Sequence, residues 1–301
     1  MNSRAPHGLS RAQLYALADA YLDALVAKDA SSVPWADQVT YTENNVQIRL
    51  GDGLWNTISA RRSTYDLKCC DPETGQVSWF GVIEERGHPA VMGLRLGVIG
   101  GRIAEVEAIV CRAMEFGPFP HIDDAAVPRP LMLADVPVDQ RVPRARMISI
   151  ADGYFDTIQL NDGTLFTEFT DDCDRIENGL QTTNTEIEDY PIARMGTADQ
   201  FRLGQYIYDD RLRDRRFPLV DEEKGIVLAA GFIDHAGKVM DVIWTDGSHH
   251  TSLFHFPHSF VLLELFKIVG GKIAGVEAVF VTVPYNMVSP WRGEQPYIVA
   301  G

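Results

Sequence analysis

Two segments of the chain carry apolar residues at helical spacing, and each opens one half of the sequence. Leu14, Tyr21 and Leu25 lie on one face of the first predicted helix, and Ser10 can cap its start. The segment from Ile148 to Ile158 repeats this spacing in the second half. The pattern therefore predicts one amphipathic helix at the start of each half.

Three runs of strand-forming residues follow in each half, and the last two of them flank a Gly-Gly pair. A two-residue Gly-Gly link between strands is typical of a tight β-hairpin. Helices followed by antiparallel strands predict an α+β domain, with the helices packed on one face of a curved antiparallel sheet. The predicted strands are Val77–Glu84, Val91–Ile99 and Arg102–Val110, then Ile226–Asp234, Val261–Val269 and Lys272–Val281.

The two halves also resemble each other in sequence. Residues 99–110 and 269–280 are identical at seven of twelve aligned positions, and three further matches occur in the same order. We interpret this as a duplicated domain. Between the halves lies a stretch rich in proline with no sustained period, which is typical of a linker. The predicted organisation is a first domain at 1–116, a Pro-rich linker at 117–143 and a second domain at 144–301.

Charge and composition exclude several classes of partner. Of the 301 residues, 42 are Asp or Glu and 27 are Lys or Arg, which gives a formal net charge of -15. Nucleic acids and anionic membrane surfaces attract basic proteins, so neither is expected as a partner. The start of the chain lacks the apolar core of a signal peptide, and the four cysteines show no metal spacing. We expect a reduced, cytoplasmic protein.

Several segments resemble the SnoaL-like branch of the nuclear-transport-factor-2-like (NTF2-like) superfamily. The resemblance implies two tandem NTF2-like cone domains. The superfamily includes SnoaL-like cyclases, ketosteroid isomerases and scytalone dehydratases. The segments are Tyr41–Asn45, Gly53–Trp55, Tyr65 and Asp71–Gln76, and in the second half Glu177–Gly179, Arg215–Glu222 and Gly225–Leu228.

A tandem acidic chain of this type is also similar to the cofactor-independent diarylpropane lyases of bacterial lignin degradation. That resemblance implies aromatic catabolism: loss of a benzylic hydroxyl and release of formaldehyde, which leaves a stilbene. The alternatives are a SnoaL-like or ketosteroid-isomerase-like isomerase, cyclase or dehydratase, and a non-catalytic binding module. Fold alone does not decide among them.

Polar residues within apolar patterns are the candidates for chemistry, because such a cone encloses an apolar pocket. Glu43 and Asn44 recur as Glu177 and Asn178, which suits an acid–base carboxylate beside an amide that holds a substrate oxygen. The alternative is turn chemistry, since Asn tolerates a left-handed backbone.

Glu107 and Glu277 are duplicated within predicted strands. If Ile99 pairs with Arg102, the hairpin register places Leu94 opposite Glu107 and, in the second half, Glu264 opposite Glu277. Opposed carboxylates can share a proton, which raises one pKa and suits a general acid. We favour the alternative, a salt-bridged strand face at the contact between the two halves.

Histidines, aromatic residues and arginines complete the candidate set. We expect His249 and His250 on a surface loop, and His255 or His258 to point inward. The aromatic residues suit a small aromatic substrate, although most aromatic residues are simply core. The arginines could hold an oxyanion, although ion pairing with nearby aspartates is the favoured alternative for most of them. The substrate-binding candidates are Tyr41, Asn44, Trp55, Arg61, Tyr208, Arg216 and Trp244.

The sequence therefore predicts an enzyme, a lyase acting on a neutral phenolic substrate. It contains no motif for a nucleotide, an organic cofactor or a metal. We expect the second half to be catalytic, because its additional length carries the histidines and the arginines. The sequence leaves open whether the chain forms a homo-oligomer. The predicted catalytic residues are Glu177, Asn178, His255 and Glu264, with Glu43 and Tyr65 in the first half as the second choice.

Overall fold

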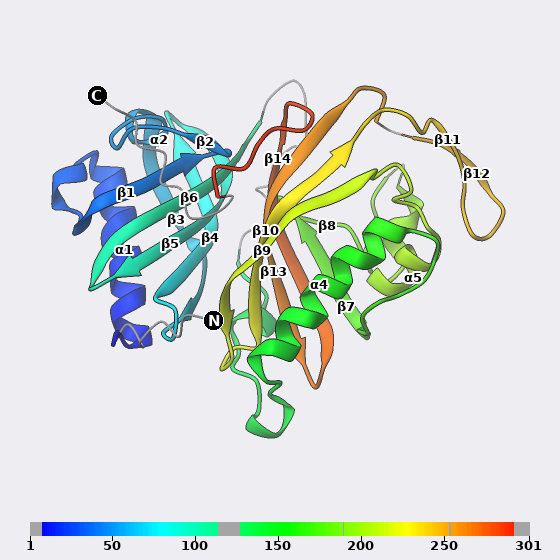
Figure 1. The fold of residues 1–301 in the computed structure, drawn as a ribbon, viewed down its shortest axis with the longest axis horizontal. Coiled ribbons are helices and arrows are strands. Elements are labelled where there is room, and N and C mark those ends of the chain that lie inside the picture. Colours follow the sequence, from blue (N-terminus) through cyan, green and yellow to red (C-terminus); the bar gives the residue numbers. More distant parts are fainter. Residues whose placement is uncertain (1–7, 114–126, 189, 253, 292–301) are drawn as a thin grey trace.

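The structure is a computed structural model that describes residues 8–113, 127–188, 190–252 and 254–291. Its first half forms one α+β domain, drawn in blue and cyan in Figure 1. A long helix comes first and a six-stranded sheet follows. The elements are α1 (Arg11–Ala27), η1 (Ala30–Ser32), β1 (Trp35–Glu43), β2 (Val46–Gln47), α2 (Leu54–Thr57), β3 (Ile58–Asp71), β4 (Gln76–Glu85), β5 (His88–Ile99) and β6 (Arg102–Arg112).

The second half repeats this order and adds a small hairpin. Its elements are α4 (Arg144–Leu160), β7 (Phe169–Glu177), β8 (Leu180–Gln181), η3 (Pro191–Arg194), α5 (Thr197–Arg202), β9 (Arg211–Asp221), β10 (Ile226–His235), β11 (Asp241–Ile243), β12 (His249–Thr251), β13 (His258–Val269) and β14 (Lys272–Val283).

Both large sheets have the same topology. Their strand orders are β2-β1-β6-β5-β4-β3 and β8-β7-β14-β13-β10-β9. The predicted antiparallel pairs are present, but the first long strand of each domain runs parallel to the last, β1 beside β6 and β7 beside β14. The sequence analysis predicted neither these first strands nor β3 and β9. The predicted fold class, α+β with two tandem cone domains, is confirmed.

Short elements occupy the described part of the predicted linker. These are α3 (Pro130–Leu133) and η2 (Val138–Gln140). Residues 117–126 of that linker lie outside the described residues, so the domain boundaries stay a prediction.

The predicted helices form because their ends are capped and one face is apolar. Ser10 and Gln13 make a capping box at the start of α1, and Lys28 ends the helix in a left-handed conformation. Leu14, Tyr21 and Leu25 are fully buried against the concave face of the first sheet. The helix α4 fills the same place in the second domain.

The Gly-Gly hairpins are present, but a bulge changes the predicted register. Gly100 and Gly101 both have positive φ, as this tight turn requires. Ile99 pairs with Arg102, yet the register shifts by one residue beyond Val98.

The same shift in the second hairpin makes the predicted Glu264–Glu277 pair wrong. Glu264 lies opposite Ala278, and Glu277 lies opposite Leu265. Because side chains alternate along a strand, Glu264 and Glu277 project from opposite faces of the sheet.

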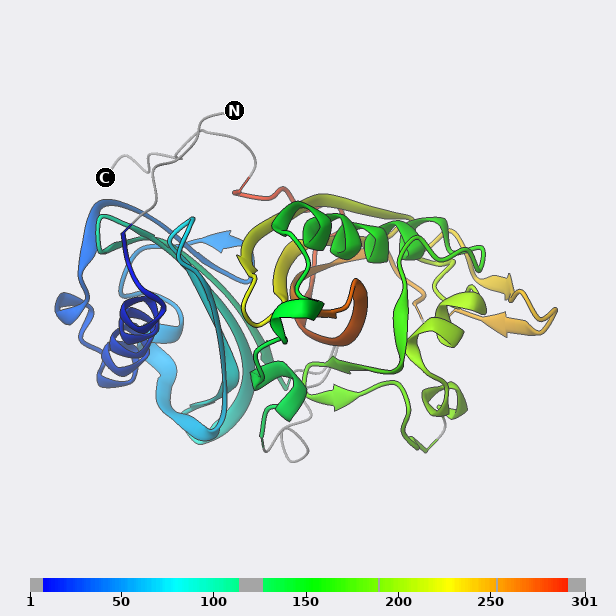
Figure 2. The same ribbon diagram turned by 90° about the horizontal axis from the view of Figure 1, so that it is seen from below.

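The domains meet through the faces of the two sheets that point away from their helices, as Figure 2 shows from below. Leu67 and Phe80 of the first sheet share one apolar cluster with Leu228 and Leu263 of the second. Each sheet therefore separates two cores, one under its own helix and one shared between the domains. A residue's place on a strand decides which of the two environments it meets.

Candidate functional site

The interior of the second cone contains charged groups among apolar side chains. Packing of the apolar core does not require these charged groups. Alternation along β7 points Arg175 and Glu177 into this cone together with the core residue Cys173. On β13, Glu264 lies between Leu262 and Phe266, both of which belong to the same core. Two predicted catalytic carboxylates, Glu177 and Glu264, therefore lie in one interior.

The two carboxylates differ in environment. Glu264 is only 5% exposed, whereas the side chain of Glu177 is 30% exposed. Burial raises the pKa of Glu264 to about 8, the charge of Glu177 adds to this rise, and Arg175 opposes it. The buried carboxyl therefore holds its proton at neutral pH beside a more accessible carboxylate.

Arg175 organises the polar groups around this pair. Its guanidinium donates to Gln200 Oε1 at 2.6 Å and to the hydroxyl of Tyr206, and it lies 3.6 Å from Glu177 Oε2. Its backbone N–H donates to Thr183 Oγ1 at 2.8 Å. The cation is thus fixed by neutral partners and remains close enough to attract the Glu177 carboxylate.

A second buried pair lies further along the interior. His235 Nδ1 is 2.9 Å from Asp209 Oδ1, and burial raises the pKa of Asp209. The His235 ring packs on Tyr208, Phe254 and His258, with ring centroids 4.4 to 5.7 Å apart. The sequence analysis missed His235 and Arg175. Arg175 lies on a strand of mostly polar residues and His235 is the last residue of its strand, so neither stands out from its local sequence.

The first cone has a different interior. Leu94, opposite Ala108, occupies the place of Glu264, and Tyr41 occupies the place of Arg175. Tyr41 and Trp55 are both buried, and Trp55 packs edge-on against Tyr21. These predicted substrate-binding side chains are therefore part of the aromatic core of the first domain.

Glu43 also has a structural role. It accepts from the backbone N–H of Leu54 at 2.7 Å and pairs with Arg112 at 2.8 Å. Both carboxylate oxygens of Glu43 therefore have a protein donor, whereas among the described residues the equivalent Glu177 has Arg175 at 3.6 Å and no hydrogen-bond donor.

Asn44 and Asn178 carry out the turn chemistry that was the alternative interpretation. Both have left-handed backbones, with φ of 46° and 50°. The side-chain amide of Asn44 bonds both backbone groups of Val110, and that of Asn178 bonds both backbone groups of Phe280. Each amide closes the turn after the first strand onto the last strand of its sheet.

The other predicted residues lie apart from the second cone's interior. Tyr65 lies between the domains, where its hydroxyl donates to Glu277. Arg61 pairs with Asp19 and Asp23, and Arg216 pairs with Glu107 across the domain contact. Glu107 and Arg216 fit the favoured alternative of a salt-bridged face between the halves.

The histidines of the additional stretch in the second half divide between the surface and the cone. His255 is exposed, so the expectation that it points inward is wrong for that residue, and His258 is the one that packs against His235. Trp244 stacks on His250 with ring centroids 3.4 Å apart. Both lie on the β11–β12 hairpin rather than in the cone.

The described part of the chain offers no metal site and no membrane span. No group of three or more His, Cys, Asp or Glu side chains within it is arranged to hold a metal ion. None of its helices is long and apolar enough to cross a membrane.

One family model matches most of the chain. A family model described as a domain of unknown function (DUF8021) matches residues 8–110 and 140–280. No curated protein matches the sequence.

Two solved structures are similar at low TM-score. One is a provisionally assigned ketosteroid isomerase from Kribbella flavida DSM 17836, 17% identical, with a TM-score of 0.27, covering 36% of this chain and 84% of that one. The other is an NTF2-like protein from Cytophaga hutchinsonii ATCC 33406, 16% identical, with a TM-score of 0.26, covering 46% of this chain and 98% of that one. Nothing about activity follows from similarities this distant.

Proposed function

This chain belongs to the family described as a domain of unknown function (DUF8021), and from that premise we propose that its second domain is the catalytic half of a cofactor-independent acid–base lyase. One observation carries the proposal: a buried carboxyl, Glu264, lies beside the more accessible carboxylate Glu177 in the same interior. Two carboxyl groups whose environments separate their pKa values are the usual arrangement for paired acid and base work.

The reaction is an elimination from a neutral phenolic diol of the diarylpropane type. Protonated Glu264 donates its proton to the benzylic hydroxyl, which leaves as water. Glu177 accepts the proton of the terminal hydroxyl while the bond to the hydroxymethyl carbon breaks. The released electron pair forms the stilbene double bond, and the carbon leaves as formaldehyde. Water, formaldehyde and stilbene account for every atom of the diol, so no oxidant or reductant is needed.

The surroundings of the two carboxylates favour a neutral aromatic substrate. Tyr206, Tyr208, Phe260 and Phe280 belong to the aromatic side chains of the second domain. A flat apolar molecule gains by packing against such rings, whereas a phosphate ester would meet the negative charge of Glu177 and of the chain as a whole. A phenol on the substrate delocalises the developing charge, which leaves positioning and proton transfer to the protein.

The test is turnover of phenolic diarylpropane diols, followed by stilbene absorbance and by formaldehyde. We expect Glu264→Gln and Glu177→Gln each to lower turnover by about 10²–10⁴-fold, as loss of a general acid or base does. Glu43→Gln is the matched control, because it changes the equivalent carboxylate in the first cone; its turnover should stay near that of the unmodified protein. Thermal melting confirms that each variant is folded.

Other outcomes would redirect the assignment. Isomerisation of an enone without formaldehyde would favour the ketosteroid-isomerase-like alternative. Tight binding of phenolic diols without turnover would favour a binding module. Loss of turnover in Glu43→Gln alone would place the active cone in the first domain.

A further inference from the structure

Two equivalent glutamates, Glu107 on β6 and Glu277 on β14, face the contact between the domains. They occupy matching positions in the sequence repeat, and both are buried, with 4% and 2% exposure. A buried carboxylate needs compensating partners, because removal from water strongly disfavours its charge. The two sites differ in how that need is met.

At Glu107 the compensation is complete. Arg95 Nε donates to Glu107 Oε2 at 2.8 Å, and Arg216 Nη2, from the other domain, donates to Oε1 at 2.5 Å. The ring of Trp291 lies over both guanidinium groups, 4.6 Å from that of Arg95 and 5.6 Å from that of Arg216. Burial acts to raise the pKa of Glu107, but the two cations outweigh it and lower the pKa.

At Glu277 these cations are replaced by neutral groups. Leu265 lies opposite Glu277 in the same register that places Arg95 opposite Glu107. From the first domain, Tyr65 supplies a hydroxyl where the other site receives a guanidinium. Arg129 contributes positive charge, but its guanidinium is paired with Asp174 at 2.5 Å. Burial raises the pKa of Glu277 to about 7.

A cavity of about 350 Å³ adjoins Glu277. Its wall is mixed, with the apolar side chains of Ile176, Leu180 and Ile187 beside the polar side chains of Gln181 and Thr185. The charged groups on the wall besides Glu277 are Arg129 and Glu186, and both are paired, Glu186 with Arg194 at 3.3 Å. Among the described residues of this wall, Glu277 is therefore the carboxyl that has no Lys, Arg or His side chain within ion-pair distance.

We propose that this cavity binds a small organic cation, an amidine, guanidine or amine on a flat apolar body. The cation would contact Glu277 as the arginine side chains contact Glu107, and the apolar body would occupy the cavity as Trp291 covers those arginines. Glu107 and its two arginine partners show which groups compensate a buried glutamate at this position of the repeat. It is independent of the proposed chemistry in the second cone, which uses the other face of the sheet.

Calorimetry on the full chain with benzamidine tests the proposal, with benzamide as the uncharged molecule of the same shape. We expect one benzamidine per chain and binding of benzamide at least about tenfold weaker, the ratio that roughly 1.4 kcal/mol of ion pairing gives. Glu277→Gln should lower the affinity for benzamidine by a similar factor. Glu186→Gln, on the same wall, is the control and should change it less than about twofold.

The unmodified protein supplies a second test that needs no substitution. Benzamidine keeps its charge between about pH 6 and pH 8.5, while Glu277, with a pKa of about 7, loses its proton over that range. The affinity should therefore rise about tenfold from pH 6 to pH 8.5, with proton release near pH 6. Equal affinity for benzamide, an affinity independent of pH, or no binding of benzamidine would each overturn the proposal.

Discussion

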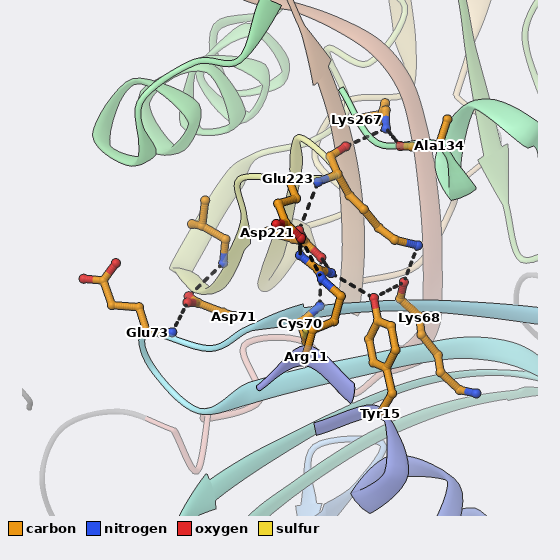
Figure 3. Close-up of polar contacts among 12 residues, drawn as sticks. Arg11, Tyr15, Lys68, Cys70, Asp71, Glu73, Ala134, Asp221, Glu223 and Lys267 are labelled. Atoms are coloured by element: carbon orange, nitrogen blue, oxygen red, sulfur yellow. Dashed lines mark hydrogen bonds and ion pairs between the residues drawn. The ribbon is translucent and has the colours of Figure 1, made fainter. Parts of the chain in front are cut away.

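Asp71 and Asp221 occupy equivalent positions in the two domains, and each accepts a backbone hydrogen bond from the strand that carries the other. Asp221 Oδ2 accepts from Cys70 N at 3.1 Å, and Asp71 Oδ2 accepts from Val220 N at 3.2 Å. Both carboxylates are almost fully buried. The two strand ends are thereby joined by a reciprocal pair of contacts, part of which is drawn in Figure 3.

Arginines from the first turns of the two long helices complete this arrangement. Arg11 makes a bidentate contact with Asp221 at 2.6 and 2.8 Å, and Arg144 contacts Asp71. Each helix therefore sends a cation to the carboxylate of the other domain. The contact between the domains is specified by buried charge as well as by apolar area.

We predict that Asp221→Ala lowers the free energy of unfolding by about 3–5 kcal/mol, because it leaves Arg11 and the Cys70 N–H without their buried acceptor. Urea denaturation measures this. Glu223→Ala is the matched control, since Glu223 also contacts Arg11 but is 55% exposed, and it should cost no more than about 1 kcal/mol. Equal costs for the two variants would contradict a special role for the buried carboxylate.

Turnover should depend on pH through Glu264. A general acid works only while protonated, and the pKa of this carboxyl is about 8. We predict that turnover falls about tenfold per pH unit above pH 8, because the protonated fraction falls by that factor. Initial rates between about pH 6 and pH 10 provide the measurement. A profile that stays flat through pH 9 would remove Glu264 as the acid.

Stability should also depend on pH, with a definite sign. The pKa of Glu264 in the folded chain, about 8, lies above its ordinary value of 4.5, so the folded state binds the proton more tightly. Its contribution to stability is complete below pH 4.5 and is lost as the pH rises through 8. We predict that raising the pH from about 5.5 to about 8.5 lowers the Tm of the Glu264→Gln variant by roughly 3–6 °C less than it lowers the Tm of the unmodified chain. Equal losses would show that Glu264 titrates normally.

Asn178 should contribute to folding rather than to catalysis. Asn178→Ala removes the bonds to Phe280 and leaves a left-handed backbone that alanine disfavours, so we predict a loss of about 2–3 kcal/mol in unfolding free energy. Asn178→Gly relieves the backbone strain and should cost less. Denaturation and turnover are measured on the same samples; a folded Asn178→Gly variant with turnover reduced a hundredfold would instead assign the amide to the substrate.

The sequence was informative where local chemistry decides the structure. The Gly100-Gly101 and Gly270-Gly271 turns, the apolar stripe of α1 and the strands around each hairpin are local patterns, and the structure confirms them. The Glu264–Glu277 pair was predicted wrongly because one bulge residue reverses the faces of a strand. No local pattern marks such a bulge.

Which residues form the site depends on contacts between segments that are distant in the sequence. Glu177 and Glu264, both named as candidates from the sequence, lie on β7 and β13, which are distant in sequence and have β14 between them. Tyr65 was placed in a cone, but its strand was not predicted, and its side chain faces the other domain. His235 went unnoticed because a single histidine at the end of a strand carries no spacing signal.

The last described residues return to the first domain, and this affects the order in which the protein can be completed. Asn45 Nδ2 donates to Val288 O at 2.9 Å, and Trp291 covers Arg95. During synthesis the first domain emerges before the strands of the second domain that cover its apolar outer face. Until those strands have folded onto it, this sheet face is exposed to chaperones, proteases and other chains.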